Sequence, residues 1–310
     1  MADAHADMTE LLVVGELCVD LIVGLGADFE GRSDGQRGGG IRFGQHEQLV
    51  DSTTLTMGSS SAITACGAAA AGVRTSMVGV VGADEFGEYL VRELGARGVD
   101  TRAVRVARGV PTGASTHLTR PDGDRAILTS MGSIGLTRAD DVDDDTLKSA
   151  RHLHVGSFFL QRALWADAPT LFGRARAAGL TTSFDGNFDP SEQWDRGILK
   201  VIPHVDVFFG NEQELTGITG AATSDSAVEQ LLDIMQAGSV VVCKLGADGA
   251  LAARRVNKRT ERVVAATPDI AGPLVDTVGA GDSLAAGFLA GLLDGRAIDG
   301  CLALGVACGT

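Results

Sequence analysis

The sequence predicts an α/β fold: a mostly parallel sheet with helices on both faces, accompanied by a small separate β-sheet. From residue 151 onward, apolar strands alternate with helical segments, which is typical of parallel strands joined by crossover helices. Apolar residues make up 45% of the 310 residues, enough to bury a sizeable core. Two alternating stretches flank the turn Pro121–Asp124, which favours a hairpin that belongs to a separate small sheet.

The first half of the chain is expected to supply one end of the large sheet and the small separate sheet. We expect strands at 11–15 and 75–81, the latter followed by a helix that ends near residues 95–98. The small sheet would combine strands around 20–24 and 49–57 with the hairpin at 113–130. Gly58 and the serines after it would cap a helix at 62–71.

The second half is expected to build most of the parallel sheet. Strands are predicted at 151–156, 180–184, 205–209 and 239–244, with helices near 162–178, 191–202 and 225–237. In such sheets ligands bind at the carboxyl ends of the strands. The polar or glycine residues at those ends are Asp185, Asn187, Asn211, Glu214, Lys244, Gly246 and Gly249. We expect a single domain, residues 1–310, because no linker is long enough to separate two domains.

Composition and charge exclude several classes of protein. A net charge of −14 argues against nucleic acid and anionic membranes as partners. The five cysteines form no CxxC pair, so we expect buried thiols in a reducing compartment. Residues 11–26 are interrupted by Glu16 and Asp20 and cannot span a membrane, and residues 1–10 do not resemble a signal peptide. We therefore expect a cytoplasmic protein.

The glycine-rich turn Asp276–Asp282 runs directly into an apolar helical segment. Helix N-termini attract anions, and Asp282 in the first turn would supply a proton acceptor. Phosphoryl transfer to a hydroxyl needs both features. An ordinary capped helix explains the same seven residues equally well.

Other candidate motifs also have two interpretations. Asn211–Glu214 is either a helix start or a Mg²⁺ site, and Lys244–Gly249 is either a phosphate and adenine contact or a plain hairpin turn. His152 and His154 share one face of a strand without a third ligand, which favours packing over metal binding. The chain contains no G-x-S-x-G elbow and no Walker A motif.

Taken together, these segments resemble the ribokinase or PfkB carbohydrate-kinase family over nearly the whole chain. Asp276–Asp282 matches the family's C-terminal signature, and Val78–Gly87 looks like its N-terminal pattern. Asn211–Glu214 is similar to its N-x-x-E motif, and Asp185–Asn187 with Trp194 is similar to its substrate-side stretch.

The resemblance implies a ribokinase-like fold, in which a Rossmann-like sheet carries an inserted β-sheet lid of about 20–57 and 113–130. It also implies ATP as phosphoryl donor and Mg²⁺ as its partner ion. Asp282 would be the base, and the amides of Gly279, Ala280 and Gly281 would form the anion hole. Asp20, Gly58, Ser59 and Asn187 would bind the sugar. Asn211, Lys244, Gly246 and Gly249 would face the nucleotide, and Glu214 the metal. Asp276 would help to hold a monovalent cation such as K⁺, as in some relatives.

The chain departs from the family pattern where the sugar should bind. Gly58–Ile63 reads Gly-Ser-Ser-Ser-Ala-Ile where the family usually has Gly-Gly-x-x-Ala-Asn, and Ile63 cannot form a hydrogen bond. Phe188–Pro190 replaces the basic residue that often follows D-x-N, which favours a neutral acceptor over a sugar acid. The family continues beyond the position of Thr310, so residues that close the nucleotide pocket are expected outside this sequence.

Three functions follow, in this order of preference. The first is an ATP- and Mg²⁺-dependent kinase that phosphorylates a hydroxymethyl group of a sugar or sugar-like alcohol. The second is a nucleoside (adenosine-like) kinase of the same fold, because Ile63 could flank a base. The third is a non-catalytic sugar-binding regulatory protein. A homodimer through the lid is also expected, since unpaired strand edges tend to be covered.

Overall fold

The large sheet contains nine strands, which pair in parallel from β11 to β5, whereas β12 pairs antiparallel with β11 and the edge strand β13 pairs antiparallel with β12. The computed structural model describes residues 8–26, 29, 41, 43–45, 47–269 and 277–310. The strand order within these residues is β13-β12-β11-β10-β9-β8-β1-β4-β5. The strands are β1 (Thr9–Val14), β4 (Thr75–Gly82), β5 (Val104–Ala107), β8 (Ala150–Val155), β9 (Thr181–Asp185), β10 (Val207–Asn211), β11 (Val240–Lys244), β12 (Ala250–Val256) and β13 (Arg259–Ala265).

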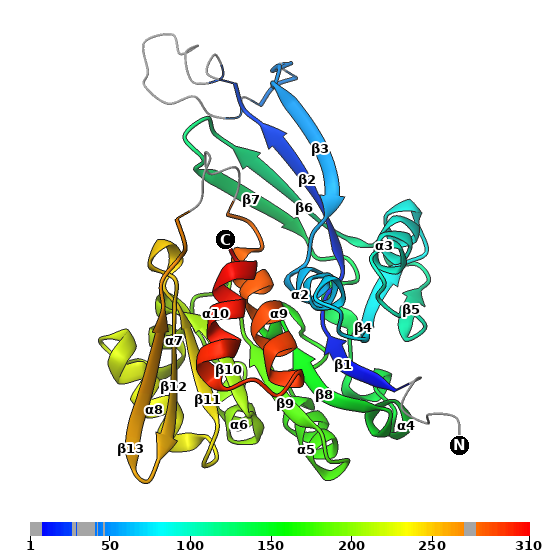
Figure 1. Ribbon diagram of the computed structural model, residues 1–310. Helices are drawn as coiled ribbons and strands as arrows, with labels where there is room; N and C mark the ends of the chain where they lie inside the picture. Colours follow the sequence, from blue (N-terminus) through cyan, green and yellow to red (C-terminus); the bar gives the residue numbers. More distant parts are fainter. Residues whose placement is uncertain (1–7, 27–28, 30–40, 42, 46, 270–276) are drawn as a thin grey trace.

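Helices cover both faces of this sheet, as Figure 1 shows, which confirms the predicted fold class. One core cluster involves α4 (Asp144–Lys148), α5 (Ala168–Ala177), α6 (Ile198–Val201), α7 (Glu212–Thr219) and α8 (Ser224–Ile234). The other involves α2 (Ser60–Ala70), α3 (Glu85–Ala96), α9 (Ala280–Leu293) and α10 (Ile298–Cys308). Leu12 and Val14 of β1 belong to the first cluster, and Leu11 and Val13 to the second, as strand alternation requires.

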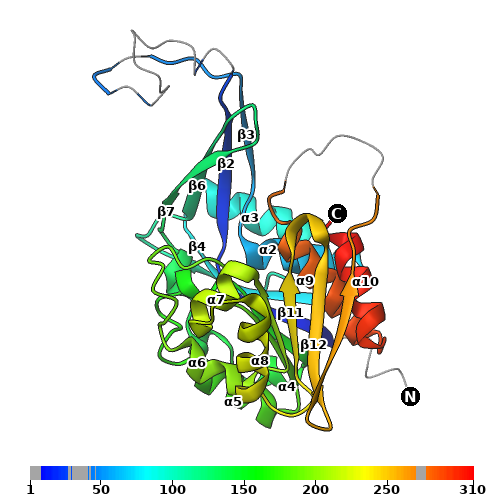
Figure 2. The same ribbon diagram turned by 90° about the vertical axis from the view of Figure 1, so that its left-hand side faces the viewer.

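The predicted small sheet is present and has the order β3-β2-β6-β7. Its strands are β2 (Cys18–Gly24), β3 (Ser52–Met57), β6 (Gly113–Thr119) and β7 (Arg125–Ser130). The sheet projects away from one end of the large sheet in both Figure 1 and Figure 2. The hairpin prediction is confirmed by the antiparallel pairing of β6 with β7. Part of the expected lid, at 27–28, 30–40, 42 and 46, lies outside the described residues.

Two of the expected helices are shorter than predicted. The segment 162–178 becomes helical only at Ala168, and 191–202 is α-helical only over Ile198–Val201. In the second case, the Asp189 carboxylate accepts the backbone N–H groups of Ser191 and Trp194, at 2.9 and 2.8 Å. Such local side-chain bonds compete with helix formation and hold a turn instead. Short 3-10 turns occur at Ile134–Leu136, Ala139–Asp141, Phe158–Leu160, Ile202–His204 and Gly246–Asp248.

Two further expectations concern cysteines and membranes. Cys18, Cys66, Cys243 and Cys301 are buried free thiols, as expected, but Cys308, the last residue of α10, is free and exposed, against the expectation. Among the described helices, none is long and apolar enough to cross a membrane.

Candidate active site

Three neighbouring strands end in polar residues at one edge of the sheet, as the parallel topology predicts. Asp185 ends β9, Asn211 ends β10 and Lys244 ends β11, and the strand register places Asn211 directly beside Lys244. Lys244 Nζ lies 2.8 Å from Asp185 Oδ2 and 3.7 Å from Glu214 Oε2. Burial alone would lower the pKa of Lys244, but the surrounding carboxylates outweigh it and raise that pKa. Lys244 is therefore a permanent cation held between two acids.

The N-terminus of α9 lies against this lysine. Gly279 takes a left-handed conformation, with φ of 75°, immediately before the helix, and no side chain caps the first turn. A Cβ atom added at Gly281 would lie 3.1 Å from Lys244 Cδ and 3.4 Å from Lys244 Nζ. An uncapped helix N-terminus beside a lysine is chemically suited to bind a phosphate group.

Asp282, in the first turn of α9, is bonded to side chains from two distant segments. Its Oδ1 atom accepts a hydrogen bond from Ser60 Oγ at 2.5 Å and lies 3.5 Å from Asn187 Nδ2. Burial raises the pKa of the Asp282 carboxyl, although Lys244 and the Ser60 hydrogen bond oppose the shift. A carboxylate of raised basicity beside an anion site can accept a proton from a hydroxyl.

Asn187 is fixed by its neighbours rather than left to rotate. Its Oδ1 atom accepts the Ser157 backbone N–H at 2.8 Å, and its own N–H donates to Asp185 Oδ1 at 3.0 Å. The backbone N–H of Ser157 identifies that atom as the oxygen, so the amide nitrogen faces Asp282. The predicted residues Asn187, Lys244 and Asp282 therefore lie together in one cluster with Asp185.

A buried acid, Glu16, lies under this cluster and was not singled out from the sequence. Its carboxylate accepts the Ser61 hydroxyl at 2.6 Å, and its side chain is 2% exposed. Burial raises the pKa of Glu16, partly offset by its hydrogen bonds with Ser61 and Ser157, and the charge of Asp282 raises it further. Glu16 anchors the first turn of α2, from which Ser60 reaches Asp282.

The raised pKa of Glu16 gives a prediction on stability. In the folded state its proton is retained at pH values where the unfolded chain has lost it, so this stabilisation is present at acid pH and is lost as pH rises through the folded pKa. We expect the difference in melting temperature between Glu16→Gln and the parent to depend on pH. The variant should gain stability relative to the parent as the pH changes from acid to neutral. Thermal melts across that range test it, with the exposed Glu88→Gln measured in parallel as a second Glu-to-Gln variant. A difference that does not depend on pH would contradict the assignment.

Asp20 and Gly58 contact each other at the base of the small sheet. Asp20 Oδ2 lies 3.3 Å from His117 Nε2, and both side chains are buried. Burial raises the pKa of Asp20, while His117 lowers it. The ideal Cβ position at Gly58 lies 2.1 Å from Asp20 Oδ1, so only glycine fits there. No sequence pattern pointed to His117, because its partner lies almost a hundred residues away in the sequence.

A second prediction tests whether this contact matters. Gly58→Ala must displace the Asp20 carboxylate, and overpacking of this kind costs about 1–3 kcal/mol. If Asp20 binds the acceptor, the acceptor KM rises about tenfold or more while the KM for ATP stays unchanged. Gly95→Ala in α3 is the matched control, since a Cβ there meets nothing within 4 Å. Equal acceptor KM values in the two variants would show that Asp20 does not bind the acceptor.

In the structure, the other residues predicted from the sequence form helix caps and turns. The Ser59 hydroxyl donates to the Glu16 carbonyl and accepts from Ala62 N, which makes it the cap of α2, so Ser60 is the serine that reaches Asp282. Asn211 and Glu214 bond each other reciprocally as a capping box of α7, at 2.9 and 2.8 Å. Gly246 and Gly249 form the turn between β11 and β12, both with positive φ, and Asp276 lies outside the described residues.

His152 and His154 act as buried hydrogen-bonding residues, as favoured from the sequence. Both rings bond Ser183 Oγ, at 2.7 and 2.8 Å. Burial lowers the pKa of His152 to about 3 and that of His154 to about 4, so both rings are neutral at physiological pH.

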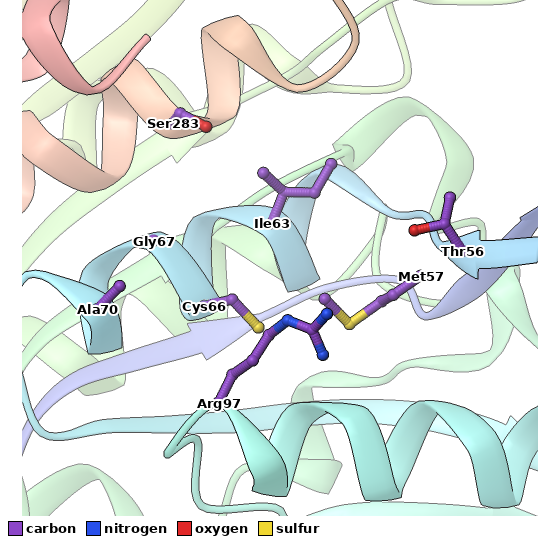
Figure 3. A pocket seen from close by; sticks show the side chains of 8 residues that line it. All are labelled: Thr56, Met57, Ile63, Cys66, Gly67, Ala70, Arg97 and Ser283. Atoms are coloured by element: carbon purple, nitrogen blue, oxygen red, sulfur yellow. The ribbon is translucent and has the colours of Figure 1, made fainter.

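An open pocket of about 500 Å³ lies along α2 (Figure 3). It is lined by Thr56, Met57, Ile63, Cys66, Gly67, Ala70, Arg97 and Ser283. Ile63 stands between this pocket and the turn before α9, because a Cβ at Gly279 would lie 3.0 Å from Ile63 Cδ1. The pocket therefore borders the Asp282 cluster with a mostly apolar wall.

The donor set fits a Mg²⁺ ion that is held jointly with nucleotide phosphates. Among the described residues, no group of three His, Cys, Asp or Glu side chains is arranged to hold a metal by itself. Asp185, Glu214 and Asp282 nevertheless all interact with a single cation, Lys244, so the cluster has surplus negative charge. Mg²⁺ commonly binds through one or two carboxylates, waters and phosphate oxygens, which is what such a cluster can offer.

Residues 8–310 match a known family, described as pfkB family carbohydrate kinase. The chain is 31% identical to the ATP-dependent ribose-1-phosphate kinase of Halopiger xanaduensis over 264 residues, which cover 85% of this chain and 82% of that protein. It is 30% identical to the 2-dehydro-3-deoxygluconokinase of Bacillus subtilis over 285 residues, which cover 86% of this chain and 82% of that protein. Among solved structures, it is similar to the adenosine kinase from Sinorhizobium meliloti, with a TM-score of 0.81 and 25% identity over 98% of this chain and 93% of that one.

Proposed function

The chain belongs to the pfkB family of carbohydrate kinases, which are phosphotransferases with an alcohol acceptor, and from this premise we propose its reaction. It transfers the γ-phosphoryl group of ATP to a hydroxymethyl group of a sugar or sugar-like alcohol. The observation that carries the proposal is the position of Asp282, in the first turn of an uncapped helix and beside Lys244. Acceptor-dependent release of ADP tests it.

Each group in the cluster has a role in this proposal. Asp282 takes the proton of the acceptor hydroxyl as the oxygen attacks the γ-phosphorus. The amides of Gly279, Ala280 and Gly281, with Lys244, stabilise the negative charge of the transferring group. Glu214 would hold a Mg²⁺ ion, which would add charge neutralisation at the phosphates. Asn187 orients the Asp282 carboxylate, and Asp20 holds acceptor hydroxyls.

A pH dependence follows from the environment of Asp282. Because burial raises its pKa, Asp282 becomes protonated at a higher pH than an exposed aspartate and then cannot accept a proton. We expect kcat to fall about tenfold for each pH unit below that pKa, and to reach a plateau above it. The measurement is kcat against pH at saturating ATP and acceptor, with melts in parallel to confirm that the protein stays folded. A kcat that stays constant as the pH falls would argue against Asp282 as the base.

A nucleoside kinase is the second candidate. The apolar Ile63 beside the Asp282 cluster and the similarity to an adenosine kinase favour it. A panel of sugars, phosphosugars, sugar acids and nucleosides separates the two acceptor classes, since one class should give the higher kcat/KM. Tight sugar binding without any ADP release would instead support a non-catalytic binding protein.

Several finer features complete the proposal. The two sheets form one domain, and the small sheet serves as a lid that excludes water when it closes. A homodimer forms through this sheet, whose outer strands carry the exposed residues Leu55 and Leu128. A K⁺ requirement and a cytoplasmic location remain predictions.

A further inference from the structure

The Ser60 hydroxyl takes up the position at Asp282 that a reacting alcohol needs. Ser60 Oγ lies 2.5 Å from Asp282 Oδ1. A base must lie within about 2.6–3.2 Å of the hydroxyl it deprotonates, so Ser60 already fills that coordination position. We propose that Ser60 stands in for the acceptor hydroxyl when no acceptor is bound, and thereby keeps water away from Asp282. This inference rests on the proposed kinase function.

The serine is held there by the packing of two helices. Ser60 is the first residue of α2, whose next turn also contacts α9: Thr64 Oγ1 donates to the Asp282 backbone carbonyl at 3.3 Å. Ile63, on the same side of α2, lies against Gly279. Residues three and four apart share a helix face, so this face of α2 packs against the first turn of α9. Ser60 is thus presented to Asp282 by rigid elements.

When an acceptor displaces the serine, the serine hydroxyl still has a hydrogen-bond partner. Ser60 Oγ also lies 3.1 Å from Asn187 Oδ1. A serine hydroxyl has one proton, so it can donate to Asp282 or to Asn187 but not to both. Rotation toward Asn187 frees Asp282 Oδ1 for the incoming hydroxyl and keeps the serine proton bonded. An alcohol held by the rest of the acceptor site can drive this exchange, whereas a lone water molecule lacks those additional contacts.

The reaction that Ser60 suppresses is hydrolysis of ATP. In that reaction a water oxygen bonds to the γ-phosphorus, the bond from that phosphorus to the β,γ-bridging oxygen breaks, the water proton passes to Asp282, and ADP leaves. Asp282 and Ser60 are both partly exposed, so water can reach the carboxylate once the serine hydroxyl is removed. The Ser60 hydrogen bond also lowers the pKa of Asp282, against the larger effect of burial, and so makes it a weaker base at rest.

The test compares Ser60→Ala and Ser60→Thr with the parent protein. Without acceptor, the alanine variant should hydrolyse Mg-ATP about tenfold faster than the parent, because a hydrogen bond to a charged group contributes at least that factor. The threonine variant keeps a hydroxyl and should hydrolyse at the parent rate. Adding Asp282→Asn to Ser60→Ala should abolish the extra hydrolysis, which ties it to the same base. Melts of each variant confirm that the helix still forms.

The outcomes separate this inference from the proposed function. If the parent phosphorylates an acceptor but Ser60→Ala hydrolyses ATP no faster, the inference is overturned and the kinase assignment stands. Phosphate found on Ser60 by mass spectrometry after incubation with Mg-ATP would also overturn it. The serine would then be a phosphoryl acceptor and not a residue that keeps water away from Asp282. Absence of ATP turnover by the parent with every acceptor would overturn both.

Discussion

Replacing Asp282 with asparagine is expected to lower kcat at least ~100-fold, the lower end of what a general base contributes. Asparagine keeps the size of the side chain and its bond from Ser60 Oγ, but it cannot take a proton. Since the base acts in the transition state, the KM for ATP and for the acceptor should change little. Steady-state kinetics with each substrate varied in turn measure the effect.

A matched control lies at the other end of the same helix. Asp294 follows α9, is exposed and contacts Arg296 at 3.1 Å, far along the helix from the cluster. Asp294→Asn should retain parental kinetics. Near-normal turnover in Asp282→Asn, with Asp294→Asn also normal, would remove Asp282 from the mechanism.

Replacing Lys244 with methionine is expected to damage both stability and turnover. Its ammonium group neutralises Asp185 and Glu214, and both acids are almost fully buried. Removing one partner of a buried ion pair costs about 3–5 kcal/mol, because the other charge is left uncompensated. Urea denaturation should show this loss at neutral pH and a smaller one at acid pH, where the Glu214 carboxylate, whose pKa is raised by burial, becomes protonated.

A double variant separates the structural role of Lys244 from its phosphate-binding role. Lys244→Met with Asp185→Asn removes both charges of the 2.8 Å pair and should recover part of the lost stability. Turnover should remain low, because the lysine beside the α9 N-terminus is still missing. Recovery of turnover together with stability would show that Lys244 acts only as a structural counter-ion.

The part of the site that the sequence predicted is the part that topology dictates. Asp185 and Lys244 follow apolar strands, and parallel strands bring their carboxyl ends to one edge of the sheet. Asp282 was predictable as a candidate because a glycine turn before an apolar helix is one of the patterns compatible with anion binding. In each case a short local pattern carried the information.

The residues that were missed depend on contacts between distant segments. Ser60 meets Asp282 across 222 positions of the chain, and Ser61 meets Glu16 across 45. Which serine of the Ser59–Ser61 run faces Asp282 depends on where α2 begins, and helix boundaries are the least certain part of a sequence-based prediction. The loop near Asp189 was mistaken for a helix for a similar reason, because one carboxylate bonded to two backbone N–H groups replaced the helical bonds.

The central claim is that this chain uses Asp282 to phosphorylate an alcohol. The most direct test measures ADP release with Mg-ATP over the panel of sugars, phosphosugars, sugar acids and nucleosides, in the parent and in Asp282→Asn. We predict that one acceptor with a free hydroxymethyl group yields ADP and a phosphate ester in equal amounts, and that the variant loses this activity at least ~100-fold. Acceptor-dependent ADP release that is the same in both proteins, or its absence with every acceptor, would contradict the claim.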